Sequence, residues 1–77
     1  MTRKYPTISG REFIKRVRIY GYVKVRQKGS HISISNGKHT VSVPDHKELA
    51  LGLLADVIKD IANHLGVDEK KIIEQLK

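Results

Sequence analysis

The chain contains no cysteine. This absence excludes a disulfide scaffold, a zinc site with thiolate ligands and a cysteine nucleophile, and it suits a cytoplasmic protein. Long apolar runs are also missing, because the longest one, from Leu49 to Ile58, is interrupted by Asp56 and falls far short of the roughly 20 residues that span a bilayer. The basic N-terminus has no apolar segment after it, so we expect neither a signal peptide nor a membrane partner.

Acidic residues are scarce in the first half of the 77-residue chain. Residues 1–43 contain ten Lys and Arg and one acid, Glu12, a net charge of +9, whereas residues 44–77 contain five Lys and Arg and seven acids, a net charge of −2. Such asymmetry favours a surface for an anion, and nucleic acid is the commonest large anion. General solubility is the alternative explanation for the charge.

The apolar pattern predicts a single α+β domain with residues 1–7 as a loose arm. Ser9 and Glu12 have the spacing of a capping box, which begins a helix that Gly21 ends. Period-two alternation over residues 23–43, with Asn36-Gly37 as a type I′ turn, predicts three antiparallel strands. Helical periodicity returns between residues 47 and 65, and Asp68 begins a short helix in a C-terminal extension, residues 67–77. We therefore expect a three-stranded antiparallel sheet with helices on one face.

Basic residues gather on two parts of this predicted fold. Val23 and Val25 are expected to face the helices, which assigns Lys24, Arg26 and His31 to an uncovered polar face. The first helix carries a basic stripe at i, i+4 and i+7, for which a solvated face is the alternative interpretation. The candidate RNA-binding residues are Arg11, Lys15, Arg18, Lys24, Arg26, Lys28 and Ser30.

His31 is the one candidate for chemistry. A histidine can take the proton from a ribose 2′-OH or protonate a leaving 5′ oxygen, and neighbouring cations can stabilise the charge on the phosphate. From the residues alone, an ordinary exposed histidine is the simpler interpretation. Paired histidine ligands at helical spacing and a glycine-rich phosphate loop are missing from the chain, and paired carboxylates are missing from its basic half, so we expect no metal and no cofactor.

Several segments, in this order and spacing, resemble the HicA toxin family: Ser9-Gly10-Arg11-Glu12, Gly29-Ser30-His31 and Val43-Pro44-Asp45-His46-Lys47-Glu48-Leu49. The resemblance extends from residue 9 to about residue 66. It implies a double-stranded-RNA-binding-domain-like α-β-β-β-α fold and a toxin that cleaves mRNA, a single-stranded RNA. It also implies a HicB antitoxin encoded beside the toxin, and His31 as the catalytic residue.

Two alternatives fit the sequence less well. A non-catalytic double-stranded-RNA-binding module usually has several lysines at the start of its second helix, where this chain has only Lys47. A DNA-binding helix-turn-helix over residues 61–76 would have a recognition helix that contains Asp68, Glu69 and Glu74, which suit a phosphate-lined groove poorly.

Overall fold

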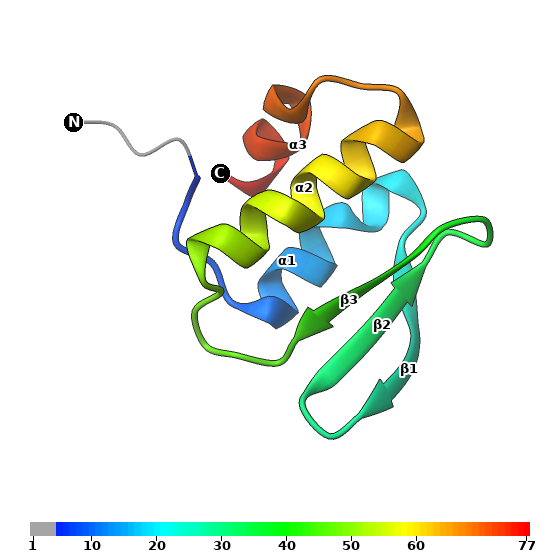
Figure 1. Ribbon diagram of the computed structural model, residues 1–77, viewed down its shortest axis with the longest axis vertical. Helices are drawn as coiled ribbons and strands as arrows, with labels where there is room; N and C mark the ends of the chain where they lie inside the picture. Colours follow the sequence, from blue (N-terminus) through cyan, green and yellow to red (C-terminus); the bar gives the residue numbers. More distant parts are fainter. Residues whose placement is uncertain (1–4) are drawn as a thin grey trace.

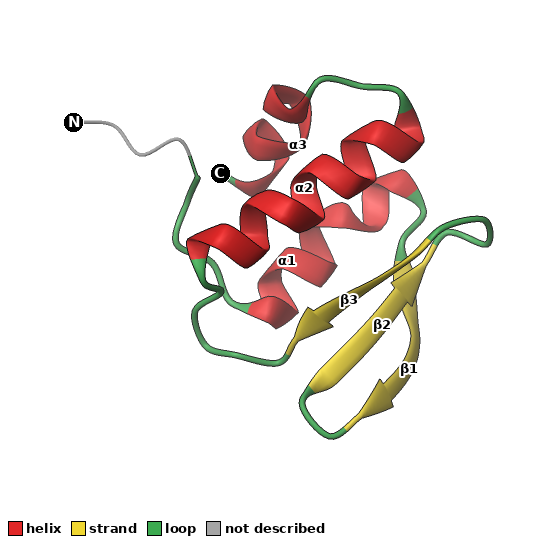
Figure 2. Ribbon diagram, in the orientation of Figure 1, coloured by secondary structure: helices red, strands yellow, loops and turns green. Residues whose placement is uncertain are grey.

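The computed structural model describes residues Tyr5–Lys77. The elements are α1 (Gly10–Arg16), a 3₁₀ helix η1 (Val17–Tyr20), β1 (Val23–Lys28), β2 (His31–Ser35), β3 (Thr40–Pro44), α2 (Leu51–Leu65) and α3 (Glu69–Leu76). The strands form one antiparallel sheet in the order β1-β2-β3, and the helices form a second layer on one side of it (Figures 1 and 2). This confirms the predicted α+β class and the α-β-β-β-α arrangement. The predicted arm lies partly outside the described residues.

Local sequence explains where the first helix begins and ends. The Ser9 hydroxyl accepts a hydrogen bond from the Glu12 amide at 3.0 Å, as predicted for the cap. The Glu12 carboxylate does not complete the capping box but accepts from Arg16 Nε at 3.0 Å. Gly21 ends the segment with φ = 89°, a left-handed conformation that glycine adopts without steric cost.

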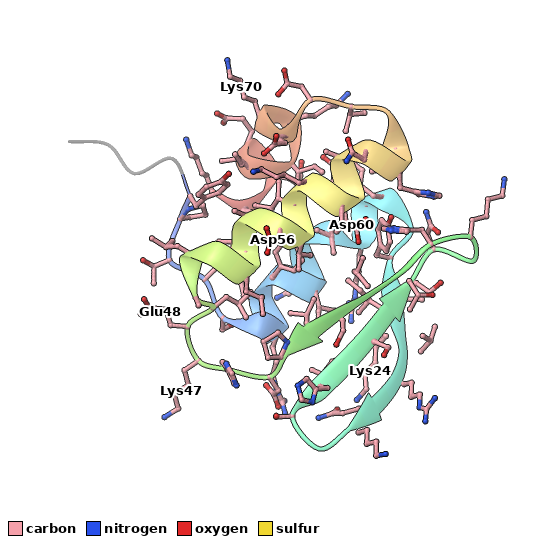
Figure 3. The ribbon with its side chains drawn as sticks, viewed as in Figure 1. Lys24, Lys47, Glu48, Asp56, Asp60 and Lys70 are labelled. Atoms are coloured by element: carbon pink, nitrogen blue, oxygen red, sulfur yellow. The ribbon has the colours of Figure 1, made fainter. Side chains whose placement is uncertain are left out.

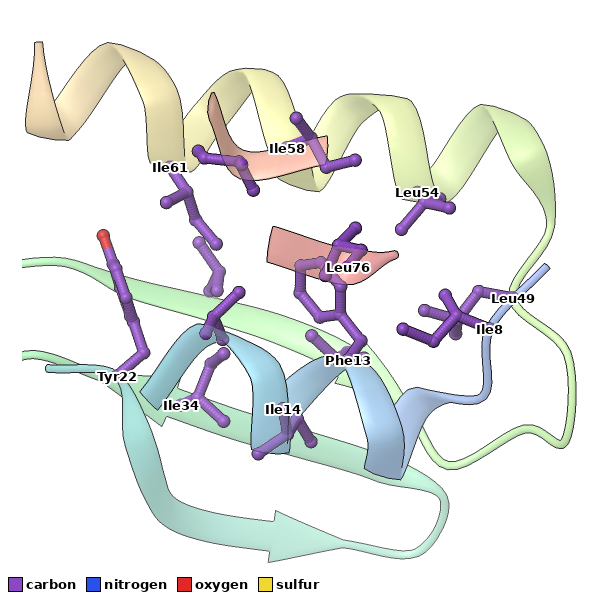
Figure 4. Close-up of a cluster of buried hydrophobic side chains, with 14 of the residues drawn as sticks. Ile8, Phe13, Ile14, Tyr22, Ile34, Leu49, Leu54, Ile58, Ile61 and Leu76 are labelled. Carbon is purple, nitrogen blue, oxygen red and sulfur yellow. The ribbon is translucent and has the colours of Figure 1, made fainter. Parts of the chain in front are cut away.

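All helices and the sheet share one hydrophobic core (Figure 4). α3 contributes Ile72, Ile73 and Leu76 to this core and contacts both α2 and the α1–η1 segment, so the C-terminal extension is part of the same packed unit. None of the helices in the described part of the chain is long and apolar enough to cross a membrane. The largest fully buried side chains are Phe13, Val17, Tyr22, Ile34, Val43, Leu54, Ile58, Ile61 and Ile72.

A β-bulge in β1 corrects the predicted assignment of faces. Lys24 pairs with Ile34 and Arg26 pairs with Ser33, so the register skips Val25. Directly opposed residues share a face, and Ile34 is buried under the helices, so Lys24 lies on the helix side. Val23 and Val25 are 49% and 58% exposed. The predictions that these valines face the helices and that Lys24 shares the face of His31 are therefore wrong.

The two hairpin turns differ from each other. Gly29 and Ser30 join β1 to β2, and only Gly29 has positive φ, at 59°, which is the pattern of a type II′ turn. Four residues join β2 to β3, and there the Asn36 side chain accepts from the amides of Lys38 and His39 at 3.0 and 2.8 Å. This Asx-type capping replaces the type I′ turn that was predicted for Asn36-Gly37. The prediction is wrong because a type I′ turn requires positive φ at both central residues, whereas Asn36 has a negative φ.

Candidate functional site

His31 is the first residue of β2, directly after the Gly29–Ser30 turn. It pairs with Lys28 on one side and Pro44 on the other, and its side chain is exposed on the face of the sheet that the helices leave open. Within residues Tyr5–Lys77, the imidazole of His31 has no hydrogen bond or ion pair. Its two ring nitrogens are therefore available to an external ligand.

Two cations accompany His31 on this open face. Lys28 lies directly opposite His31, and Arg26 lies opposite Ser33, two residues further along β2. Directly opposed side chains have Cβ atoms about 4.5–5.5 Å apart, so Lys28 can reach a phosphate that touches His31. Ser30 is exposed in the adjoining turn. The open face thus combines a free imidazole with two positive charges and a hydroxyl.

The turn before His31 is held by Asp45 at the end of β3. The Asp45 amide donates to the Ser30 carbonyl at 2.6 Å, and its carboxylate accepts from Arg11 Nε at 2.9 Å and from Arg11 Nη2 at 3.0 Å. The hydrogen bond from Arg11 is the main reason why the pKa of Asp45 lies below its ordinary value. Arg11 and Asp45 are 34 residues apart, so sequence periodicity gave no signal for this pair.

Gly10 completes this frame. Its amide donates to the His46 carbonyl at 2.9 Å, and a Cβ at this position would collide with the Pro44 carbonyl oxygen. Only glycine allows the start of α1 to approach β3 so closely. The frame consists of Gly10, Arg11, Ser30, Asp45 and His46, and it explains why three distant sequence segments converge near His31.

The predicted RNA-binding residues divide between two sides of the sheet. Arg26, Lys28 and Ser30 lie near His31, as predicted. Arg11, Arg18 and Lys24 instead line a hollow on the helix side, between the first helical segment and β1. Figure 3 shows Lys24 projecting from the sheet. Lys15 is exposed on α1 and lines neither site.

A second histidine cluster, which the sequence did not reveal, lies beyond the other end of β2. His39 Nδ1 is 2.7 Å from the Tyr22 hydroxyl, and His39 Nε2 is 3.2 Å from Asp60 Oδ1. The ring of His39 stacks on that of His64, with centroids 4.5 Å apart. Asp60, on α2, points toward this hairpin (Figure 3). The i, i+4 spacing of Asp60 and His64 on one helix was the available signal.

Burial is the main cause that raises the pKa of Tyr22, and the charge of Asp60 adds to it. Among the described residues, no group of three or more His, Asp or Glu side chains is arranged to hold a metal ion. The His39 cluster links the residue before β1, the β2–β3 hairpin and α2 through side-chain contacts.

Comparison with models of protein families matches residues 10–62 to the HicA toxin of bacterial toxin–antitoxin systems. The matched segment covers more than half of the chain and includes the whole sheet, His31, every residue of the frame and most of α2. It ends before α3. No curated protein and no solved structure matches the chain.

Proposed function

Because the chain belongs to the HicA toxin family and is thus the toxin half of a toxin–antitoxin pair, we propose that it is an endoribonuclease that cleaves mRNA. His31 acts as its general acid–base residue. The observation that carries this proposal is the environment of His31: an exposed imidazole without an internal partner, directly opposite Lys28 and next to a turn held by Asp45.

The proposed reaction needs one histidine and one phosphate-binding cation. His31 takes the proton from a ribose 2′-OH, whose oxygen attacks the adjacent phosphorus while the bond from phosphorus to the 5′ oxygen breaks. That 5′ oxygen takes a proton from water, and the products carry a 2′,3′-cyclic phosphate and a 5′-hydroxyl. In the alternative order, protonated His31 donates to the leaving oxygen and water accepts the first proton. Lys28 and Arg26 stabilise the negative charge that develops on the phosphate.

The decisive experiment compares His31→Ala with His64→Ala on a labelled single-stranded RNA. His64 is also exposed but lies on α2, away from the open face, so it controls for loss of a surface histidine. We expect the parent and His64→Ala to release products with a 2′,3′-cyclic phosphate, with and without EDTA, and to arrest growth of the host. His31→Ala should do neither, while it still binds the RNA.

The possible outcomes separate the proposal from its alternatives. Equal cleavage by His31→Ala and the parent would show that His31 is not the acid–base residue. Salt-sensitive RNA binding by the parent without any cleavage would support the non-catalytic RNA-binding module instead. Inhibition by EDTA would contradict the metal-independent mechanism.

We further propose that a HicB-like antitoxin inhibits this toxin by covering the open face. This face bears His31, Arg26 and Lys28, and no segment of the described chain packs on it. The net charge of +7 favours an acidic partner, because opposite fields accelerate association. In the complex, amide hydrogen exchange should slow at residues 24–26 and 29–33. Slowing confined to α2 and α3 would contradict direct occlusion.

A further inference from the structure

The hollow on the helix side of the sheet has a definite structural origin. The bulge at Val25 turns Lys24 toward the helix layer. Because of this, β1 places no apolar side chain against which α1 could pack. The result is a space of about 190 Å³ at the edge of the sheet. Its lining residues are Arg11, Ile14, Arg18, Lys24, Gln27 and Ile32.

The charges around this hollow do not cancel. Arg11 is neutralised by Asp45, which binds its guanidinium through both carboxylate oxygens. Lys24 Nζ donates to Gln27 Oε1 at 2.7 Å, a neutral partner, and Arg18 has no ion pair within the described chain. Two positive charges therefore remain, and this surplus favours an anion such as the phosphodiester backbone of RNA, which carries one negative charge per phosphate.

The rest of the lining is not what an inorganic anion or an acidic side chain requires. The floor is made of Ile14 and Ile32, which are 7% and 3% exposed. An apolar floor beside planar guanidinium groups can hold a nucleobase, because bases stack on such planes when they leave a helix. The combination of an apolar floor with two cations at its rim therefore suits a nucleotide better than a carboxylate.

The position of the hollow relates it to His31. His31 and Ile32 are consecutive in β2, and their side chains point to opposite faces of the sheet. Lys28 and Gln27 have the same relation in β1. Only the thickness of the β1–β2 hairpin separates the two sites, and β1 is an edge strand of the sheet, as Figure 2 shows. A single RNA strand that passes around this edge can contact both.

We infer that the hollow is a second nucleotide-binding subsite, which holds a nucleotide beyond the two that the bond cleaved at His31 joins. The base lies on Ile14 and Ile32, and its phosphate contacts Arg18 and Lys24. This inference rests on the proposed function, since it assumes that RNA is the substrate. It assigns the helix-side cations a role in substrate affinity that is separate from the chemical step.

In the test, the full chain is titrated with adenosine monophosphate (AMP) or with inorganic phosphate. Binding is measured from the chemical-shift changes of the backbone amide resonances. AMP should shift the resonances of residues near Arg18, Gln27 and Ile32 and bind more tightly than phosphate. The double variant Arg18→Gln/Lys24→Gln should lose about tenfold or more in AMP affinity, as expected for loss of charge-assisted contacts. Lys38→Gln/Lys59→Gln, which removes the same charge from exposed positions elsewhere, should bind AMP like the parent.

Kinetics then separate the subsite from the chemistry. For a long RNA, Arg18→Gln/Lys24→Gln should raise KM about tenfold and leave kcat unchanged, whereas cleavage of a dinucleotide that occupies only the His31 site should not change. If the parent and the double variant bind AMP with equal affinity, the inference is overturned. This holds even if the parent cleaves RNA as proposed. Binding of a glutamate-rich peptide, but not AMP, at these residues would also overturn it. AMP binding without any RNA cleavage would leave the subsite standing and refute the proposed nuclease.

Discussion

The two ends of β2 place two histidines in opposite situations. At its start, His31 is exposed and has no internal partner in the described chain. Just beyond its end, the imidazole of His39 is 20% exposed, binds Tyr22 and Asp60, and stacks on His64. Both ring nitrogens of His39 have hydrogen-bond partners inside the fold, whereas those of His31 have none in the described chain. The residue type alone therefore does not indicate chemistry; the presence or absence of internal partners does.

The two ends also differ in how the fold holds them. Backbone hydrogen bonds from the amides of Gly10 and Asp45 fix the His31 end, together with the Arg11–Asp45 ion pair. Side chains fix the His39 end, through Tyr22 and Asp60. Substitution of a side chain should therefore have different consequences at each end, and this leads to three predictions of decreasing size.

The largest effect should follow replacement of the two histidines. His31→Ala should lower cleavage by roughly two to four orders of magnitude, the usual contribution of general acid–base catalysis and equivalent to about 3–5 kcal/mol of activation free energy. Its free energy of unfolding should change by no more than about 0.5 kcal/mol. His39→Ala should do the reverse: cleavage near the parent rate, but stability lower by about 1–3 kcal/mol, because the buried Tyr22 hydroxyl loses its partner.

Urea unfolding and single-turnover cleavage of both variants test this contrast. A His31→Ala protein that unfolds, or a stable but inactive His39→Ala protein, would reverse the assignment of the two ends.

The next effect concerns the backbone frame. Gly10→Ala should destabilise the fold by about 1–3 kcal/mol, because the new methyl group overlaps the Pro44 carbonyl, which is backbone and cannot rotate away. Cleavage should fall as well, since Asp45 and the turn before His31 are displaced. Gly52→Ala is the matched control: its added methyl meets no atom within 4 Å on α2, so thermal unfolding should be unchanged or slightly later. Equal melting of Gly10→Ala and the parent would show that the frame is not tightly packed.

The smallest effect is a pH dependence at the His39 end. Burial raises the pKa of Tyr22, so the folded state favours the neutral hydroxyl. The corresponding stability is fully present below the unfolded pKa, near 10, and is lost as the pH rises through the folded pKa. Tyr22→Phe should cost about 0.5–1.5 kcal/mol at neutral pH, through loss of the hydrogen bond to His39, and should weaken the alkaline loss of stability.

Tyr20→Phe is the comparison for this experiment, because burial also raises the pKa of Tyr20, which lies away from His39 on η1. Each variant should remove its own share of the alkaline dependence. A Tyr22→Phe protein whose stability falls above pH 10 as steeply as that of the parent would contradict the prediction.

Local signals in the sequence predicted most of the fold. Ser9, Gly21 and Asp68 mark helix ends through their own chemistry, and the exposed position of His31 follows from its alternation with Ile32 and Ile34. The face of β1 was mispredicted because its valines alternate regularly and nothing local marks Val25 as the bulge. The pairing of β1 with β2 and the burial of Tyr22 determine which side chains of β1 face the helices, and both are long-range effects.

The candidate site was predictable only in part for the same reason. The Gly29–Ser30–His31 turn is local, but the pairing of Arg11 with Asp45 joins residues from α1 and the end of β3. The contacts of His39 likewise join a hairpin to α2. Such contacts depend on how elements pack, so a single sequence shows the residue types but not their partners. The role of His31 itself stays a prediction.

The bulge in β1 has one more consequence, for behaviour at high concentration. An outer strand with a regular row of free amides and carbonyls is a template on which other copies can assemble into extended sheets. Here the row is interrupted at Val25, and Lys24, Arg26 and Lys28 bring like charges together whenever two such edges approach. The same irregularity that opens a hollow beside α1 therefore protects the exposed valines of this edge from aggregation.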